Sequence, residues 1–138
     1  MSDSNALGVS LASFVAGGAI PVGMPVKMDG TTAKSVVGCD AIADLCVGIF
    51  EGHGGTGAGG AAVSGDIIAI RQHGIAKCLA GATITINAPQ MVEVTSGRVV
   101  DLTGATAKFL GVALQAAADG DLFEVLLGHL PNSPGPTA

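Results

Sequence analysis

The 138-residue chain is 49% hydrophobic, 3% aromatic and 12% charged, with 22 glycines and neither Trp nor Tyr. Such a length suffices for one compact domain, and Val, Ile, Leu and Ala must fill its core. The net charge of −5 and the scattered positions of the six Lys and Arg residues argue against nucleic-acid binding, which requires clustered basic side chains. The low charged fraction, about half of the usual 25%, indicates surface that neighbouring subunits cover.

The chain begins with an apolar segment. From Leu7 to Ala12, large apolar residues alternate with small or polar ones, a period typical of a half-buried strand. Because this segment precedes an internal repeat, we interpret residues 1–15 as an arm that contacts a neighbouring molecule through Leu7, Val9, Leu11 and Phe14. An ordinary edge strand or terminus is the alternative.

Residues 4–26 carry no charge, which raises the question of a membrane span. Glycines and prolines interrupt this stretch, however, and no basic segment precedes it. We therefore predict neither a transmembrane helix nor a secretory signal.

The chain contains one structural unit twice. Residues 16–25 recur as residues 80–89, at a spacing of 64 residues (Ala16 to Ala80), with matching Ala-Gly, Ile and Pro positions. Two further matches follow in each copy: residues 46–49 with 109–112, and residues 65–70 with 120–125. We infer a duplication, and this repeat is stronger evidence for architecture than any single motif is for chemistry.

The two copies differ in length. The spacing falls to 55 residues between Gly65 and Gly120, so the first copy contains an insertion, which we place in the glycine-rich residues 52–62. We expect an exposed, flexible loop there. The residues that define this loop are Gly52, His53, Gly54, Gly55, Thr56 and Gly57.

Each copy predicts the same order of strands. An Ala-Gly turn precedes a short strand, a proline ends or edges it because proline donates no ladder hydrogen bond, and a hairpin and two more strands follow. The expected strands are residues 20–22, 25–28, 46–50 and 67–72 in the first copy, and 83–86, 91–94, 98–102, 109–114 and 122–127 in the second. Helical signals are weak, with one or two turns over residues 40–45.

We therefore predict an all-β fold, a small barrel or sandwich built from two tandem similar β units, with short helical turns at most. The single β domain is expected to span residues 16–130, with the copies at 16–79 and 80–130. Residues 131–138 are rich in Pro, Gly and Ser and predict a flexible tail.

Motifs for catalysis or cofactor binding are missing. The glycine-rich insertion lacks the Gly-Lys-Ser/Thr of a phosphate-binding loop, since no lysine lies between Lys34 and Lys77. His53, His73 and His129 are widely separated, no Cys-x-x-Cys or His-x-x-x-His pair occurs, and no Gly-x-Ser-x-Gly motif is present. We predict no catalytic residue, metal site or cofactor; a metal site assembled from distant residues is the alternative.

Three stretches of the chain resemble a known family. Residues 16–28, residues 47–49 (Val-Gly-Ile) and residues 64–74 (Ser-Gly-Asp-Ile-Ile-Ala-Ile-Arg-Gln-His-Gly) are similar to the capsid cement, or head-decoration, proteins of tailed bacteriophages. The resemblance extends over roughly residues 14 to 128 and includes both copies. The chain departs from the plainest members of that family by its second copy and by its glycine-rich insertion.

The resemblance implies a β-rich structural protein, not an enzyme, that is made in the host cytoplasm and binds the outer surface of the assembled capsid. It also implies the major capsid protein as partner, a homotrimer as oligomeric state, and a virion location, with Leu7, Val9, Leu11 and Phe14 as candidate contacts to the capsid or to another subunit. The alternative is a host-surface or carbohydrate-binding module displayed on the virion, with the loop around His53 facing outward. The absence of Trp and Tyr, which stack on sugars, argues against that alternative.

Overall fold

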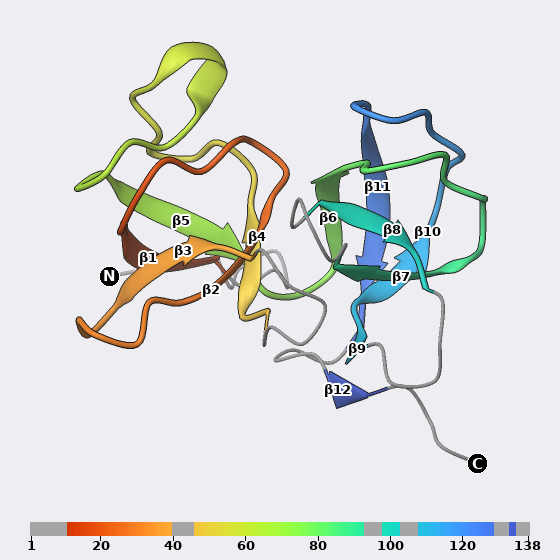
Figure 1. Ribbon diagram of the computed structural model, residues 1–138, viewed down its shortest axis with the longest axis horizontal. Coiled ribbons are helices and arrows are strands. Elements are labelled where there is room, and N and C mark those ends of the chain that lie inside the picture. The colour runs from red at the N-terminus through yellow and green to blue at the C-terminus, as the bar shows by residue number, and fades with distance from the viewer. Residues whose placement is uncertain (1–10, 40–45, 93–97, 103–107, 129–132, 135–138) are drawn as a thin grey trace.

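The computed structural model describes residues 11–39, 46–92, 98–102, 108–128 and 133–134. Within these residues the protein is built of strands, and the 3-10 turn η2 (Ala58–Gly60) is the helical element there. Two five-stranded sheets lie side by side (Figure 1) and define two units, which we name unit 1 (residues 11–71) and unit 2 (residues 75–128). The predicted all-β fold of two tandem similar units, one of them a small barrel, is confirmed.

Unit 1 is a closed barrel with the strand order β1-β3-β2-β4-β5. Its strands are β1 (Leu11–Ala16), β2 (Pro25–Met28), β3 (Ser35–Gly38), β4 (Gly48–Phe50) and β5 (Ile67–Arg71). Strand β1 pairs antiparallel with β5 and parallel with β3, and the parallel pairing closes the barrel. At this closure the Val15 N–H donates to the Lys34 carbonyl oxygen (2.8 Å), and the Lys34 ammonium lies 4.2 Å from the centroid of the Phe14 ring.

Unit 2 has the strand order β6-β11-β10-β7-β8. Its strands are β6 (Ile75–Leu79), β7 (Pro89–Val92), β8 (Val99–Asp101), β10 (Gly111–Ala113) and β11 (Leu122–Leu127). A parallel bridge between Ala80 and Val99 joins the two outermost strands. A separate pair, β9 (Lys108–Phe109) and β12 (Ser133–Pro134), runs antiparallel.

The two units share their strand register. Cross-strand pairs of unit 1 have matching pairs in unit 2. Val15–Ile67 matches Leu79–Leu122, Pro25–Ile49 matches Pro89–Val112, and Ile49–Arg71 matches Val112–Leu126. The bridge Ile20–Ala62 likewise matches the bridge Ile84–Ala117. Since register decides which side chains face the core, each of these paired strand positions in one unit has a definite structural equivalent in the other.

A positive-φ turn before the second strand of each unit shows how different residues satisfy one backbone requirement. Gly23 has a φ of 92° and Asn87, its equivalent, has a φ of 69°. The N–H of Gly23 donates to the Phe50 carbonyl oxygen (2.7 Å), and that of Asn87 donates to the Ala113 carbonyl oxygen (2.8 Å). Gly and Asn are the residues that enter the left-handed region most readily, so the turn survives although the residue differs.

Each unit has its own apolar core. The core of unit 1 comprises Phe14, Ala16, Ile20, Met24, Val26, Val36, Phe50, Ala62, Ile68 and Ile70. The core of unit 2 comprises Ala76, Cys78, Ala80, Ile84, Val99, Leu110, Ala113, Phe123, Val125 and Leu127, together with three side chains contributed by unit 1. Aliphatic residues fill both cores, as the composition requires, with Phe14, Phe50 and Phe123 as their aromatic members.

The last residues of the expected N-terminal arm form a strand of unit 1. Residues 11–16 form β1, the first strand of unit 1, so the expected boundary at residue 15 falls inside a strand of the barrel. At the 64-residue spacing β1 corresponds to β6, because residues 11–16 (Leu-Ala-Ser-Phe-Val-Ala) align with residues 75–80 (Ile-Ala-Lys-Cys-Leu-Ala). Each unit therefore begins with a strand, β1 or β6, that precedes the Ala-Gly turn. Sequence analysis had placed the start of each copy at that turn.

Other sequence predictions fall partly or wholly outside the described residues. The helical turn expected at 40–45 and the part of the arm before Leu11 lie outside them. Of the expected flexible tail, 131–138, the described residues are Ser133 and Pro134, which pair with Phe109 and Lys108. No helix among the described residues is long and apolar enough to cross a membrane.

Candidate interaction surfaces

Hydrogen bonds from β6 join the two units at a junction. The N–H groups of Lys77 and Leu79 point from β6 toward unit 1, where Lys77 donates to Glu51 Oε2 (2.6 Å) and Leu79 donates to the Gly23 carbonyl oxygen (2.9 Å). Leu79 is the equivalent of Val15, whose N–H closes the barrel of unit 1. In unit 1, this strand edge is hydrogen-bonded by the unit's own chain, at Lys34. In unit 2, the equivalent edge is hydrogen-bonded by unit 1.

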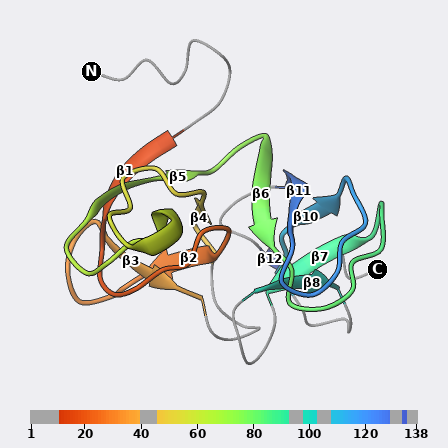
Figure 2. The same ribbon diagram turned by 90° about the horizontal axis from the view of Figure 1, so that it is seen from above.

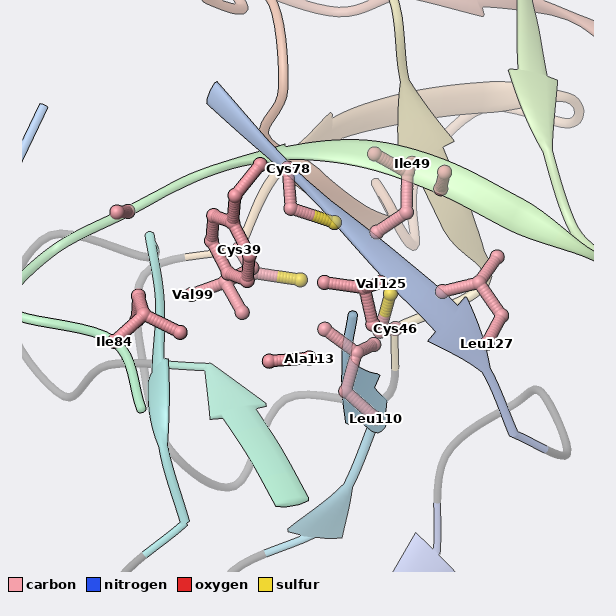
Figure 3. Packing of buried hydrophobic residues seen from close by; sticks show 13 residues of the cluster. Cys39, Cys46, Ile49, Cys78, Ile84, Val99, Leu110, Ala113, Val125 and Leu127 are labelled. Atoms are coloured by element: carbon pink, nitrogen blue, oxygen red, sulfur yellow. The ribbon is translucent and has the colours of Figure 1, made fainter. Parts of the chain in front are cut away.

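The side chains at the junction belong to a single core. Three residues of unit 1 pack among the core residues of unit 2 (Figure 3): Cys39, Cys46 and Ile49. Unit 2 has Cys78 and Ala113 where unit 1 has the larger Phe14 and Phe50. Because protein interiors are close-packed, we infer that these smaller residues leave space that the side chains of unit 1 occupy, which makes the junction a part of the fold and not a flexible linker.

Glu51 connects the two units through both of its carboxylate oxygens. Oε1 accepts a hydrogen bond from Arg71 Nε at 2.7 Å, and Oε2 accepts the N–H of Lys77. The side chains of Arg71 and Glu51 are 17% and 10% exposed. A largely buried carboxylate is costly unless it is paired and hydrogen-bonded, and here it has both an ion pair and a backbone donor.

The three cysteines are buried at this junction, and none of them forms a disulfide. Burial raises the pKa of Cys78 well above its ordinary value, and the neighbouring Cys46 and Glu51 add to this effect. A thiol with a raised pKa is a poor nucleophile, so Cys78 acts as a small hydrophobic residue. Among the residues that the structure describes, no group of three or more His, Cys, Asp and Glu is placed to hold a metal ion.

The glycine-rich insertion projects from one end of unit 1 (Figures 1 and 2) and is tied to the barrel by Asp66. The Thr56 N–H and hydroxyl each donate to the Asp66 carboxylate at 2.9 Å, and the Val63 N–H donates to it at 2.9 Å. These donors, first Val63 and then Thr56, lower the pKa of Asp66. In unit 2, which lacks the insertion, the equivalent Asp121 accepts a hydrogen bond from the Ala118 N–H at 3.2 Å.

Close backbone approaches explain why this loop is rich in glycine. A Cβ on Gly54 would overlap the carbonyl oxygen of Ile67, and one on Gly55 would overlap that of Gly60. Of the residues predicted to form the exposed loop, His53, Gly54 and Thr56 are exposed, whereas Gly52, Gly55 and Gly57 are half-buried.

Two of the four predicted contact residues, Leu11 and Phe14, lie among the residues that the structure describes. Phe14 is 8% exposed and packs in the core of unit 1, and Leu11 pairs with Arg71 across β1 and β5. Leu7 and Val9 lie outside the described residues. Phe14 is therefore buried within its own unit, and a contact role for the rest of the arm stays a prediction.

Sequence analysis missed an apolar face on unit 2. Ile75, Leu126, Val112 and Pro89 form a cross-strand row over four neighbouring strands, from β6 to β7. Ile75 and Leu126 are 49% and 48% exposed, and Leu114, beside this row, is 37% exposed. The exposed face of an antiparallel sheet is usually polar. The signal in the sequence was the run Leu122–Leu127, which carries apolar residues on both of its faces.

Comparison with known proteins gives a likeness in fold. No protein-family model and no curated protein matches the sequence. Among solved structures, the head fiber gp8.5 N base in bacteriophage phi29 is similar, with a TM-score of 0.60 over 91% of this chain and 97% of that chain. The two sequences are 11% identical, so the likeness establishes a shared fold.

Proposed function

We propose that this protein is a structural component of a phage virion that binds the outer surface of the capsid, stabilises the head and has no enzymatic activity. The observation that carries the proposal is the fold shared with the base of a phage head fiber over 91% of the chain. The resemblance of residues 16–28, 47–49 and 64–74 to capsid cement proteins supports it independently. A cement protein is the finer form of the proposal, with the major capsid protein as partner and a homotrimer as oligomeric state.

The surface chemistry suits such a role. The charged fraction of 12% leaves much surface that a partner can cover at little cost in desolvating charges. Three side chains of unit 1 belong to the core of unit 2, so the protein can bridge neighbouring capsid subunits without bending between its units. Burial of apolar area would then drive docking.

Binding to heads tests the proposal. Purified protein is incubated with undecorated heads of the phage that encodes it, and the heads are sedimented. We expect the protein to sediment with the heads up to one saturating ratio of protein to capsid subunit, and the decorated heads to lose DNA at a higher temperature than bare ones. Heads of an unrelated phage serve as the control. Absence of binding, or equal binding to both kinds of head, contradicts the proposal.

The exposed insertion favours one alternative, a host-surface or carbohydrate-binding module. His53 and Thr56 are exposed on a loop that projects from unit 1 (Figure 1). A variant in which residues 52–60 are replaced by the short connection of unit 2, residues 115–118, separates the two functions. If the protein is a cement protein, the variant binds heads like wild type. If the loop is a receptor site, phage carrying the variant adsorb poorly to host cells although the heads are fully decorated.

A further inference from the structure

Two apolar side chains of unit 1 are covered by other parts of the chain. Ile49 of β4 is fully buried because it packs among the core residues of unit 2. Val22, in the turn before β2, is half-buried under the glycine-rich insertion, where a Cβ on Gly52 or Gly60 would lie 3.5 or 3.6 Å from Val22 Cγ2. Unit 2 and the insertion are therefore the covers of unit 1.

Unit 2 lacks both covers. The equivalents of Ile49 and Val22 are Val112, which is half-buried, and Ile86, which is 60% exposed. Val112 lies in the apolar row that crosses unit 2 from β6 to β7. Contiguous exposed apolar side chains mark interaction sites in soluble proteins. We define the outer face of unit 2 as Ile75, Ile86, Val112, Leu114 and Leu126.

The size of the outer face favours a segment of the same chain as its occupant. The row crosses four strands, which is about 14 Å, and Val112 and Leu114 lie about 7 Å apart along β10. A stable interface between separate molecules buries about 800 Å² on each partner, well above what this face offers. A tethered segment needs less area, because the tether keeps its local concentration in the millimolar range.

The N-terminal arm begins beside this face. Strand β1 starts at Leu11, which pairs with Arg71 at the end of β5. Arg71 precedes Ile75 by four residues, and the connection between them turns at Gly74, which has a φ of 82°. In Figure 2 the start of β1 and the start of β6 lie on the same side of the molecule. Residues 1–10 span up to about 33 Å when extended, so the arm is long enough to cross the outer face.

The arm also has the side chains that such a contact needs. Leu7 and Val9 are two residues apart, so both point to one side when the backbone is extended. The C-terminal tail is the other segment that starts near the face. Its residues 133–134 pair with β9, however, and Leu130 is its single large apolar residue. The arm is therefore the better occupant.

We propose that the N-terminal arm folds back over the outer face of unit 2 in the same chain, with Leu7 and Val9 against Ile75 and Leu126. Burial of apolar area drives the contact. Sequence analysis assigned Leu7 and Val9 to a neighbouring molecule, whereas this contact lies within one molecule. It depends neither on the capsid nor on the oligomeric state, so it is independent of the proposed function.

Nuclear Overhauser effects between methyl groups test the contact in the full-length protein. Isotope-labelled wild type should show them from Leu7 and Val9 to Ile75 and Leu126. Leu126→Asp should abolish the effects from the arm to Ile75, and Leu7→Asp should abolish those from Val9. A mixture of labelled and unlabelled protein, observed through an isotope filter, should show no such effect between molecules.

Ile67→Asp is the matched control, since Ile67 is 72% exposed and belongs to unit 1; this variant should keep the effects. Amide spectra of unit 1 confirm that the variants fold, and Leu126→Ser replaces Leu126→Asp if that variant does not. Absence of the effects in wild type, their persistence in the Leu126 or Leu7 variant, or their loss in the control overturns the proposal. Effects seen only between molecules also overturn it, and would assign the arm to a second copy.

Discussion

The two units have the same strand register, but unit 1 is a closed barrel and unit 2 is a five-stranded sheet whose outermost strands meet at the Ala80–Val99 bridge. Unit 1 closes on itself, with the Phe14 and Phe50 rings inside and β1 paired to β3. Unit 2 has Cys78 and Ala113 at the equivalent positions, and unit 1 supplies Ile49 and two cysteines to its core. The duplicated halves are therefore not independent, because side chains of the first half fill part of the core of the second.

The largest expected loss of stability comes from truncating Ile49, which is fully buried, whereas its equivalent in unit 2, Val112, is half-buried. Ile49→Ala should lower the free energy of unfolding by about 2–5 kcal/mol, because it opens a cavity in a core shared by both units. Val112→Ala, at the same register position in unit 2, should cost about 1 kcal/mol, because Val112 is half-buried.

Urea denaturation of both alanine variants measures this difference. Equal losses for Ile49→Ala and Val112→Ala would mean that the junction between the units contributes no more than an ordinary surface.

Removing the Glu51 side chain should cause the next largest loss of stability. Glu51→Ala removes the partner of Arg71 and the acceptor of the Lys77 N–H, and hydrogen bonds to a charged group contribute about 1.5–3 kcal/mol each when a partly buried donor is left unpaired. Asp119→Ala is the control, because Asp119 forms an exposed ion pair with Arg98 and both residues belong to unit 2. Equal melting temperatures for the two variants would contradict the role of Glu51 as a link between the units.

The sequence predicted most of this architecture, but not the junction. Internal similarity and the Gly, Pro and Asp turns were enough to predict two tandem β units, because turn chemistry and alternation are local signals. Strand β1 was missed as part of the repeat since Leu11, Ser13, Phe14 and Val15 differ from their equivalents in β6, although the alternation matches. The junction was missed because it depends on which outward positions another unit covers, and a single strand's pattern does not reveal that.

A smaller effect tests whether unit 1 fills space inside unit 2. Ala113→Phe gives unit 2 a phenylalanine at the position equivalent to Phe50 of unit 1. Since Ile49 and its neighbours already occupy the shared core, the added ring should overpack it and cost about 1–3 kcal/mol. Thermal melting monitored by far-UV circular dichroism measures the change. A stabilised variant would show that the core of unit 2 has room for the ring.

The smallest effect concerns the aspartate that opens the last strand of each unit. In unit 1 the ionised Asp66 accepts from Val63 and Thr56, and these bonds lower its pKa from the ordinary 3.8. A carboxyl whose pKa is lower in the folded than in the unfolded protein stabilises the fold above its ordinary pKa, and this stabilisation is lost as the pH falls through the lower value. Asp66→Asn should therefore melt below wild type at pH 6, and the difference should shrink as the pH is lowered below 3.8.

Asp121→Asn, which loses the carboxylate bond to Ala118 in the unit without the insertion, should lower the melting temperature at pH 6 by less. If the two variants behave alike, the contact from Thr56 does not hold the insertion on the barrel, and the loop is attached by its backbone alone.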